Sequence, residues 1–366
     1  MKPLALWLSL TERKDARMPI IDSDAHVIET SETWSYIPTN ETAHTPLSVT
    51  RNWGPEIEGR QGETAQDFWV IDGNLQSKMF ALGHDAPEAS RTLSDVEKRL
   101  EHMDQLGVDI QVLYPTVFLR PLTKKPDLQY TLYRSYNRWL ADIWSRSKNR
   151  LRWVAMAPLL APEKLRDELV FCKENGAVGI FLSGQECDRV LSDPWFFSFY
   201  ELAQELDMAV CPHSASNCFT TYDFYKDDPG FNKFKLATIG SFHSLIWHKV
   251  PQRFPEIRWG WIEVSSQWVP YVVNDLMLRF KRRGEEIPNM PLKAWNMWVA
   301  CQVTDDLDWV LKYAGEDNLV VGSDYGHADT SAEIEAIQKL KENGSVPAHI
   351  INKILDDNAR ALYGIE

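Results

Sequence analysis

The chain has 366 residues, of which 44% are hydrophobic and 25% are charged, so it is long enough to bury a large core. Its formal net charge of −13, without a concentrated Lys/Arg stripe, argues against a nucleic-acid partner. No stretch approaches the roughly 20 apolar residues that span a bilayer, so we expect a soluble protein with no membrane partner.

The N-terminal residues contain a short apolar run, which is followed by the charged stretch 12–17. A secretory signal peptide has a longer apolar segment and a small-residue cleavage site, so we expect none here and interpret residues 1–18 as an N-terminal extension. The five cysteines are an odd number without paired CxxC spacing. This usage indicates reduced thiols and a cytoplasmic location.

From residue 19 onward, short β-rich segments alternate with longer helical patterns, which is typical of βα units around a parallel sheet. Eight segments have nearly continuous apolar residues, as expected for strands covered on both faces: 19–24, 109–114, 152–157, 178–182, 209–213, 257–263, 297–303 and 318–323. Helical patterns lie between them at 94–106, 130–146, 193–206, 304–313 and 347–363. The sequence therefore predicts a (β/α)₈ barrel over residues 19–366.

Two long connections interrupt this alternation. Residues 29–91 after the first strand are predicted to hold a small insertion, and residues 214–240 after the fifth are predicted to form a lid over the site. The 15 tryptophans are expected mainly in the core and in a subunit interface, which predicts a homo-oligomer. The alternative is that they wall an aromatic substrate pocket.

Catalytic groups of such barrels come from the carboxyl ends of several strands, so titratable residues at those ends are candidate site residues. The first strand ends in Asp24 and His26, whose side chains share one side of an extended chain because side chains alternate with period two. The fifth strand ends in His213, and Asp324 follows the eighth. Two imidazoles and two carboxylates that converge on one rim predict a site for a divalent metal ion.

Several motifs around these residues resemble a known family. The sequences at 21–26 (IDSDAH), 322–325 (GSDY) and 358–364 (NARALYG), together with His213, resemble the amidohydrolase superfamily. The sequences at 254–255 (FP) and 268–271 (WVPY) resemble in particular the branch with aminocarboxymuconate-semialdehyde and resorcylate decarboxylases.

The resemblance covers residues 19–365, the whole predicted barrel. It implies that Asp24, His26, His213 and Asp324 are metal ligands. It also implies a catalytic role for Asp324, which would orient or deprotonate a metal-bound water.

Two departures from the family pattern bear on the mechanism. Many hydrolases of the superfamily bridge two metals with a carboxylated lysine at the end of strand four, where this chain reads FLSG at 181–184. The decarboxylase branch commonly has a histidine at the end of strand six, where this chain has Glu263. Glu263 is therefore a candidate for proton transfer, for orienting a ligand, for a substrate contact or for a further metal ligand. His243, in the helical-looking segment 241–249, is the other candidate catalytic acid.

Substrate-binding candidates flank these positions. Arg120 follows an apolar stretch, and its guanidinium suits a substrate carboxylate. His327 and Asp329 lie just beyond Asp324, where they line the rim or cap the loop.

These features predict a metal-dependent decarboxylase or hydrolase of a small organic acid, aromatic in one version, with one or two ions of zinc, manganese or iron. The alternative is a non-haem iron oxygenase, because carboxylates beside imidazole suit iron and a carboxylate can bridge two metals where the lysine is missing. A third hypothesis is a non-catalytic barrel that serves as the partner subunit of an active homologue. The predicted partners are a small-molecule substrate and further copies of the chain.

Overall fold

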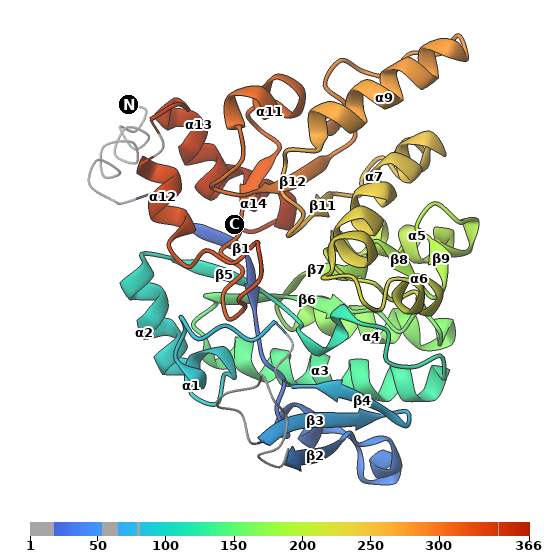
Figure 1. The fold of residues 1–366 in the computed structure, drawn as a ribbon, viewed down its shortest axis with the longest axis vertical. Coiled ribbons are helices and arrows are strands. Elements are labelled where there is room, and N and C mark those ends of the chain that lie inside the picture. The colour runs from blue at the N-terminus through green and yellow to red at the C-terminus, as the bar shows by residue number, and fades with distance from the viewer. Residues whose placement is uncertain (1–17, 53–64, 79–80, 343) are drawn as a thin grey trace, which may run out of the picture.

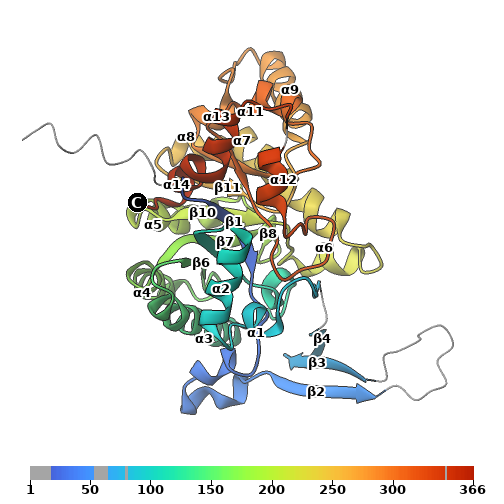
Figure 2. The same ribbon diagram turned by 90° about the vertical axis from the view of Figure 1, so that its left-hand side faces the viewer.

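The computed structural model describes residues 18–52, 65–78, 81–342 and 344–366, so the predicted N-terminal extension lies outside the described residues except for Met18. Eight parallel strands form one sheet, and helices surround it (Figures 1 and 2). In their order around the sheet, the strands are β1 (Ile21–His26), β5 (Ile110–Tyr114), β6 (Leu151–Met156), β7 (Ala177–Ser183), β10 (Ala209–His213), β11 (Trp259–Trp261), β12 (Met297–Cys301) and β13 (Leu319–Val321). The predicted (β/α)₈ barrel is confirmed, with strand ends that differ by a few residues.

The segment after β13 closes this sheet against β1. The amide of Asp324 donates to the carbonyl of Asp24 at 2.9 Å, and the amide of His26 donates to the carbonyl of Tyr325 at 2.9 Å. Gly322 allows this approach, because a Cβ built on it would lie 2.2 Å from the Cβ of Asp24. The closure therefore brings two predicted metal ligands, Asp24 and Asp324, to one place on the rim.

The five predicted helical segments each contain a helix, and further helices that were not predicted also cover the barrel. The α-helices are α1 (Glu88–Arg91), α2 (Val96–Leu106), α3 (Pro126–Arg146), α4 (Pro162–Glu174), α5 (Phe197–Glu205), α6 (Phe219–Phe224), α7 (Ala237–Trp247), α8 (Val250–Arg253), α9 (Val269–Arg282), α10 (Pro291–Ala294), α11 (Leu307–Ala314), α12 (Ala336–Glu342), α13 (Ala348–Asn352) and α14 (Asn358–Tyr363). Short 3₁₀ turns are η1 (Thr33–Tyr36), η2 (Thr39–His44), η3 (Val117–Leu119) and η4 (Pro194–Phe196), and π turns are η5 (Phe231–Leu236) and η6 (Lys353–Asp357).

Helix ends follow local chemistry. The helix α2 begins at Val96, two residues after the predicted start, because Asp95 accepts a hydrogen bond from the amide of Lys98 at 3.2 Å. Gly107 ends this helix in the left-handed conformation, with φ of 72°. The predicted helix at 347–363 is divided into α13, η6 and α14.

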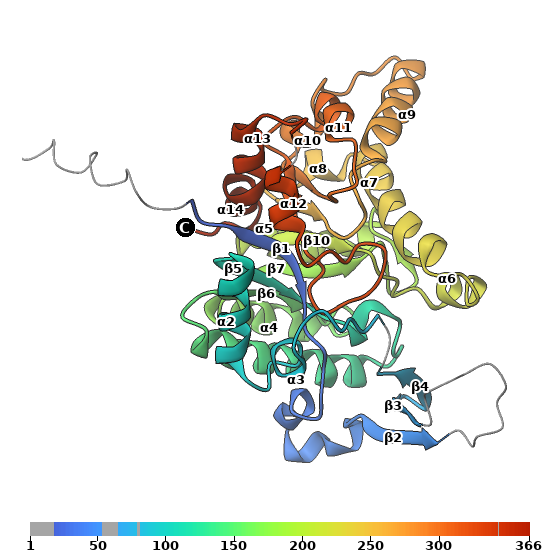
Figure 3. The same cartoon turned by 60° about the vertical axis from the view of Figure 1, so that its left-hand side comes forward.

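The long connection after β1 contains its own antiparallel sheet, formed by β2 (Leu47–Asn52), β3 (Ala65–Ile71) and β4 (Asn74–Ser77). Figures 1 and 3 show this sheet at one end of the molecule, below α3. The preceding turns pack on α3, where the Arg134 guanidinium donates to the Glu41 carboxylate at 2.7 Å. The boundaries of the insertion, 29–91, stay a prediction.

The connection after β10 contains α6 and η5 before α7 begins (Figure 3). Its exposed side chains include Phe224 and Phe231. The role of residues 214–240 as a lid stays a prediction.

Tryptophans contribute strongly to the core, as expected: Trp139, Trp153, Trp259 and Trp261 are among the largest fully buried side chains. All five cysteines are free thiols. Within the described ranges, no helix has both the length and the apolar character needed to cross a membrane. The homo-oligomer stays a prediction.

Candidate metal centre

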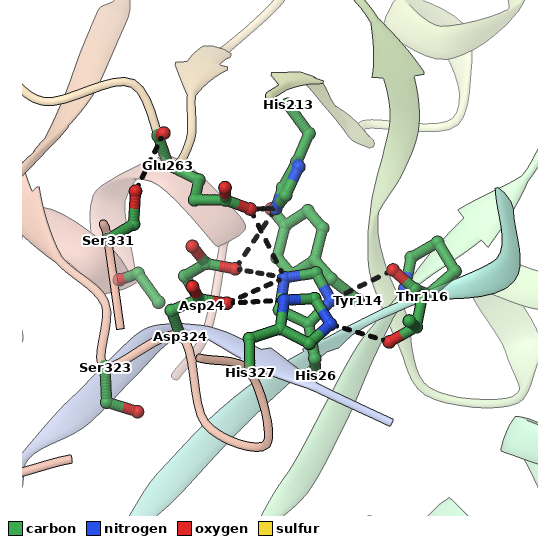
Figure 4. A network of polar contacts seen from close by, with 12 residues as sticks. Asp24, His26, Tyr114, Thr116, His213, Glu263, Ser323, Asp324, His327 and Ser331 are labelled. Atoms are coloured by element: carbon green, nitrogen blue, oxygen red, sulfur yellow. Dashed lines mark hydrogen bonds and ion pairs between the residues drawn. The ribbon is translucent and has the colours of Figure 1, made fainter. Parts of the chain in front are cut away.

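Imidazoles and carboxylates meet in a buried cluster at the carboxyl ends of the strands (Figure 4). Nε2 of His26 lies 3.4 Å from Oδ1 of Asp24, 3.4 Å from Oδ1 of Asp324 and 3.7 Å from Oε2 of Glu263. Nε2 of His213 lies 3.3 Å from Oδ1 of Asp24 and 3.3 Å from Oε2 of Glu263. The donor atoms therefore meet from the ends of β1 and β10 and from the residues that follow β11 and β13.

Two of these carboxylates are carried by an unusual backbone conformation. Glu263 has φ of 61° and Asp324 has φ of 52°, which is the left-handed region that non-glycine residues rarely adopt. Such residues concentrate at functional sites because the surrounding structure must hold them there. Below Glu263, the buried Asp305 accepts hydrogen bonds from the amide and hydroxyl of Ser266, both at 2.7 Å, and fixes the turn.

Hydrogen bonds fix the ring orientation of His26 and His327. Nδ1 of His26 lies 2.9 Å from the carbonyl of Pro115, which only accepts, so Nδ1 carries the proton and Nε2 presents a lone pair to the cluster. The hydroxyl of Thr116 donates to the carbonyl of Val27 at 2.7 Å and therefore accepts from Nε2 of His327 at 2.8 Å. Nδ1 of neutral His327 then faces Oδ1 of Asp324, 2.8 Å away.

A layer of buried polar side chains supports the cluster from below. Asp22 accepts from the amide of Ser323 at 2.9 Å, from its hydroxyl at 2.6 Å and from the side chain of Gln111 at 3.0 Å. Glu29 accepts from the amides of Thr116 and Val117 at 3.0 and 2.9 Å. These bonds hold the segments that carry Asp24, Asp324 and Thr116.

Burial and close packing shift the pKa values of the residues in the cluster. Burial raises the pKa of Glu263 and of Asp324 well above their usual values, and neighbouring carboxylates raise both further, with Asp329 acting on each of them. Burial also raises the pKa of Asp24, but the interaction with His213, whose Nε2 lies 3.3 Å from Oδ1, outweighs it and holds that pKa below its usual range. Burial lowers the pKa of His327. Such opposing shifts in one cluster are typical of functional sites.

The donor set fits a metal ion. Protein ligands bind such ions at about 2.1 Å, with angles of about 90–109° between neighbouring ligands. Two ligands of one ion then lie about 3.0–3.4 Å apart, which is close to most of the donor–donor distances in the cluster. Nε2 of His26, Oε2 of Glu263 and Nδ1 of His327 are buried and have no hydrogen-bond partner in the described part of the chain. Ligand atoms within 4.8 Å of one another fall into two overlapping groups, one of Asp24, His26, His213 and Glu263 and one of His26, Glu263, Asp324 and His327.

Comparison with known proteins identifies the family. A family model described as "Amidohydrolase" matches residues 21–365. The chain belongs to this amidohydrolase family.

Solved structures similar to this amidohydrolase have low sequence identity and show a shared fold. An amidohydrolase from Mycobacterium avium subsp. paratuberculosis K-10 has a TM-score of 0.75 and 19% identity, covering 96% of this chain and 99% of its own. The 5-carboxyvanillate decarboxylase of Sphingomonas paucimobilis has a TM-score of 0.68 and 15% identity, covering 96% and 100%. The 5-carboxyvanillate decarboxylase of Novosphingobium aromaticivorans DSM 12444, complexed with manganese and 4-hydroxy-3-methoxy-5-nitrobenzoic acid, has a TM-score of 0.68 and 17% identity. This match covers 95% of this chain and 96% of the decarboxylase.

The structure of the amidohydrolase brings together most of the residues predicted from the sequence. Asp24, His26, His213, Asp324 and Glu263 share the cluster. His327, predicted at the rim as a substrate contact, belongs to the cluster as well.

Two predicted residues lie apart from this cluster. His243 is on α7, where its Nε2 lies 3.1 Å from the carboxylate of Asp275 on α9 and its side chain is 30% exposed. Arg120 is buried and donates to the carbonyl of Ser77 in β4 at 3.1 Å. The catalytic role of His243 and the carboxylate-binding role of Arg120 are not supported by these positions and stay predictions.

Sequence reasoning missed the residues that orient the cluster: Asp22, Glu29 and Thr116. Thr116 carried a usable signal, because it follows the end of β5 by two residues, where a strand-end search would find it. Glu29 and Asp22 carried only a weak signal, since a single carboxylate near a strand end is common.

A cavity of about 100 Å³ lies over the other half of the rim. The loops after β5, β6, β7 and β10 line it. Its apolar walls include Leu122, Leu132, Tyr133, Leu160 and Phe219, and its polar lining consists of Thr123, Lys124, Gln129, Glu186, Asp188 and Asn217. Asn217 follows the cluster residue His213 by only four positions in the chain. The aromatic walls are thus a tyrosine and a phenylalanine, while the fully buried tryptophans pack in the core.

Proposed function

We propose that this amidohydrolase is a metal-dependent decarboxylase of a small aromatic acid. The observation that carries the proposal is the buried set of imidazole and carboxylate donors at the carboxyl ends of β1, β10, β11 and β13. Asp24, His26 and His213 are the core of the ligand set, and Asp324 and Glu263 complete it. A divalent ion, when bound, supplies Lewis-acid polarisation of substrate oxygens.

Decarboxylation breaks the bond between the ring carbon and the carboxylate carbon. The electron pair stays on the ring carbon, carbon dioxide leaves, and a proton forms the new carbon–hydrogen bond. Glu263 and Asp324 lie in the cluster, so their carboxyl groups are the candidates that hold and deliver this proton. His243 is the weaker candidate because it pairs with Asp275 on the helices outside the strand ends.

The apolar cavity offers a place for the substrate ring. Its volume of about 100 Å³ is of the order of the roughly 150 Å³ cavity known to accept benzene. The proposal for an aromatic acid is also supported by the structural neighbours, which include decarboxylases of 5-carboxyvanillate. A hydrolase that acts on a similar acid uses the same ligands, and the reaction product distinguishes the two.

An oxygen-dependent hydroxylase with iron is the second candidate. Glu263 favours it, because this carboxylate stands where the decarboxylase branch commonly has a histidine and makes the centre rich in carboxylate oxygen. Oxygen consumption by the iron-loaded protein separates this candidate from the first.

The experiment is an assay of carbon dioxide release from 5-carboxyvanillate and 2,6-dihydroxybenzoate by protein reconstituted with manganese, zinc or iron. We expect release with at least one ion, loss of activity with a chelator and recovery on adding the ion back. Oxygen uptake without carbon dioxide release would favour the hydroxylase. Protein that holds no metal under any condition would contradict both functions and favour the non-catalytic barrel.

A further inference from the structure

The predicted ligands of a single ion do not form one group in the structure. Asp24, His26 and His213 group with Glu263, whereas Asp324 groups with His26, Glu263 and His327. The centre therefore offers six donor residues, and only His26 and Glu263 belong to both groups. One ion with four protein ligands uses only part of this set.

His26 cannot serve two ions. Its Nδ1 donates to the carbonyl of Pro115, which leaves Nε2 as the single lone pair that faces the cluster. Glu263 differs, because a carboxylate has two oxygens and can bind a different ion with each. Glu263 is thus the residue that can join the two groups.

His327 is oriented as a ligand, independently of the acidic residues. The bond to Thr116 places the proton on Nε2, so the lone pair on Nδ1 points at Oδ1 of Asp324 across 2.8 Å. Two acceptor atoms that face each other repel unless a proton or a cation lies between or beside them. His327 is 3% exposed and its Nδ1 has no hydrogen-bond partner in the described part of the chain.

The charge of the centre exceeds what one divalent ion neutralises. Asp24, Glu263 and Asp324 are all buried, so their ionised carboxylates bring three negative charges into a space closed to solvent. Across the described ranges, no lysine or arginine forms an ion pair with the three buried carboxylates. Buried charges without partners are strongly unfavourable, and one divalent ion leaves one of the three negative charges without a partner.

We propose that the centre binds two divalent cations bridged by Glu263, the first on Asp24, His26 and His213 and the second on Asp324 and His327. This inference rests on the proposed metal dependence and extends it.

The test is the metal content of the full chain, stripped with a chelator and reconstituted with Mn²⁺ alone. We expect about two manganese ions per chain by elemental analysis, and an exchange-coupled electron paramagnetic resonance spectrum, since one carboxylate bridges both ions. His327→Ala should hold about one ion per chain with an uncoupled spectrum. The matched control is His349→Ala, which removes an exposed imidazole 3.5 Å from Glu316 and should keep the wild-type content.

One manganese ion per wild-type chain would overturn the second site while leaving the proposed metal dependence intact. Two ions that persist in His327→Ala would also overturn it, because His327 would then not be a ligand. No bound manganese at all would contradict the proposed function as well. If His327→Ala fails to fold, the stoichiometry and spectrum of the wild-type chain decide the question.

Discussion

The two halves of the barrel rim both contain buried carboxylates, but they satisfy them differently. On the cavity side, Oε1 of Glu186 in β8 (Gln185–Glu186) accepts from the amide of Ser183 at 2.6 Å, from its hydroxyl at 3.0 Å and from the side chain of Asn217 at 3.1 Å. On the cluster side, Oε2 of Glu263 and both oxygens of Asp324 have no hydrogen-bond partner in the described part of the chain.

This difference separates a structural carboxylate from a functional one. A buried polar group that has its hydrogen bonds holds the structure together, whereas one without them is costly unless it has another partner. The three hydrogen bonds to Glu186 all end on Oε1. A proton on Oε2 therefore neutralises this carboxylate without breaking any of them. Glu263 and Asp324 share their space with further carboxylates, which a cation neutralises.

The largest expected effect is from His213→Ala, which removes an imidazole from the cluster side. We expect metal affinity to fall by more than about 100-fold, because even residues that only orient a ligand cost about 10–100-fold. The measurement is titration of the stripped protein with Mn²⁺. His243→Ala should keep wild-type affinity, because that imidazole pairs with Asp275 on the outer helices.

An unchanged affinity in His213→Ala would contradict the assignment of the cluster. Full metal binding combined with lost activity in His243→Ala would instead restore His243 as the catalytic acid that the sequence suggested.

Gly322→Ala should distort the cluster through the backbone. The new Cβ would lie 2.2 Å from the Cβ of Asp24, so β1 and the segment after β13 must separate. We expect a loss of about 1–3 kcal/mol in the free energy of unfolding, as for other overpacked sites, together with weaker metal binding. Urea denaturation measures the first quantity.

The matched control for this change is Gly240→Ala in α7, where an added Cβ meets nothing within 4 Å. This variant should be as stable as the wild type or slightly more stable, because alanine favours the helix. Equal stability of the two variants would contradict this account, because it would show that an added Cβ fits between β1 and the segment after β13.

Thr116→Val tests the orientation of His327. Valine has nearly the shape of threonine but offers no acceptor to Nε2 of His327, so the ring loses the bond that fixes its protonated nitrogen. We expect the affinity for the ion beside His327 to fall by about 10–100-fold. If two ions are bound, the affinity for the ion on Asp24, His26 and His213 should change little. The exposed Thr42→Val is the control, and an unaffected titration in Thr116→Val would remove the argument for the tautomer of His327.

The smallest effect on the centre is expected from Glu186→Gln on the cavity side. Burial raises the pKa of Glu186 from its ordinary value of 4.5 to about 7. The folded state therefore holds this proton more tightly than the unfolded state, so wild-type stability falls as pH rises from about 4.5 to 7 and is constant above. This contribution is at most about 3 kcal/mol, and Glu186→Gln should lack it.

Urea denaturation of both proteins at pH 5 and pH 8 measures this contribution. The two proteins should differ in their pH dependence while their metal content is the same. An equal pH dependence would show that Glu186 is already ionised in the folded protein.

Much of the fold followed from the sequence, because parallel strands covered on both faces need continuous apolar runs. The small sheet β2–β4 was predicted only as an insertion, since its exposed residues, such as Leu47 and Leu75, carry no such signal. For the site, strand-end placement predicted Asp24, His26, His213 and Asp324. It could not reveal that His327 returns to the cluster, because Gly326, with φ of 92°, turns the chain there.

The proton-transfer residue was the least predictable part. His243 has the chemistry of a catalytic acid, but α7 places it opposite α9, and helix packing of this kind leaves no local pattern in the sequence. Glu263 was recognisable as the ionisable group after β11. The turn that holds its left-handed backbone is fixed by the bond between the nearby Ser266 and Asp305, which lies 39 residues after Ser266 in the chain.

The most direct test of the central claim is a crystal structure of the manganese-loaded protein with anomalous diffraction data. The account predicts an anomalous peak between the side chains of Asp24, His26 and His213. A peak only in other parts of the chain would contradict it. So would an ordered cluster that shows no peak in crystals grown with excess manganese.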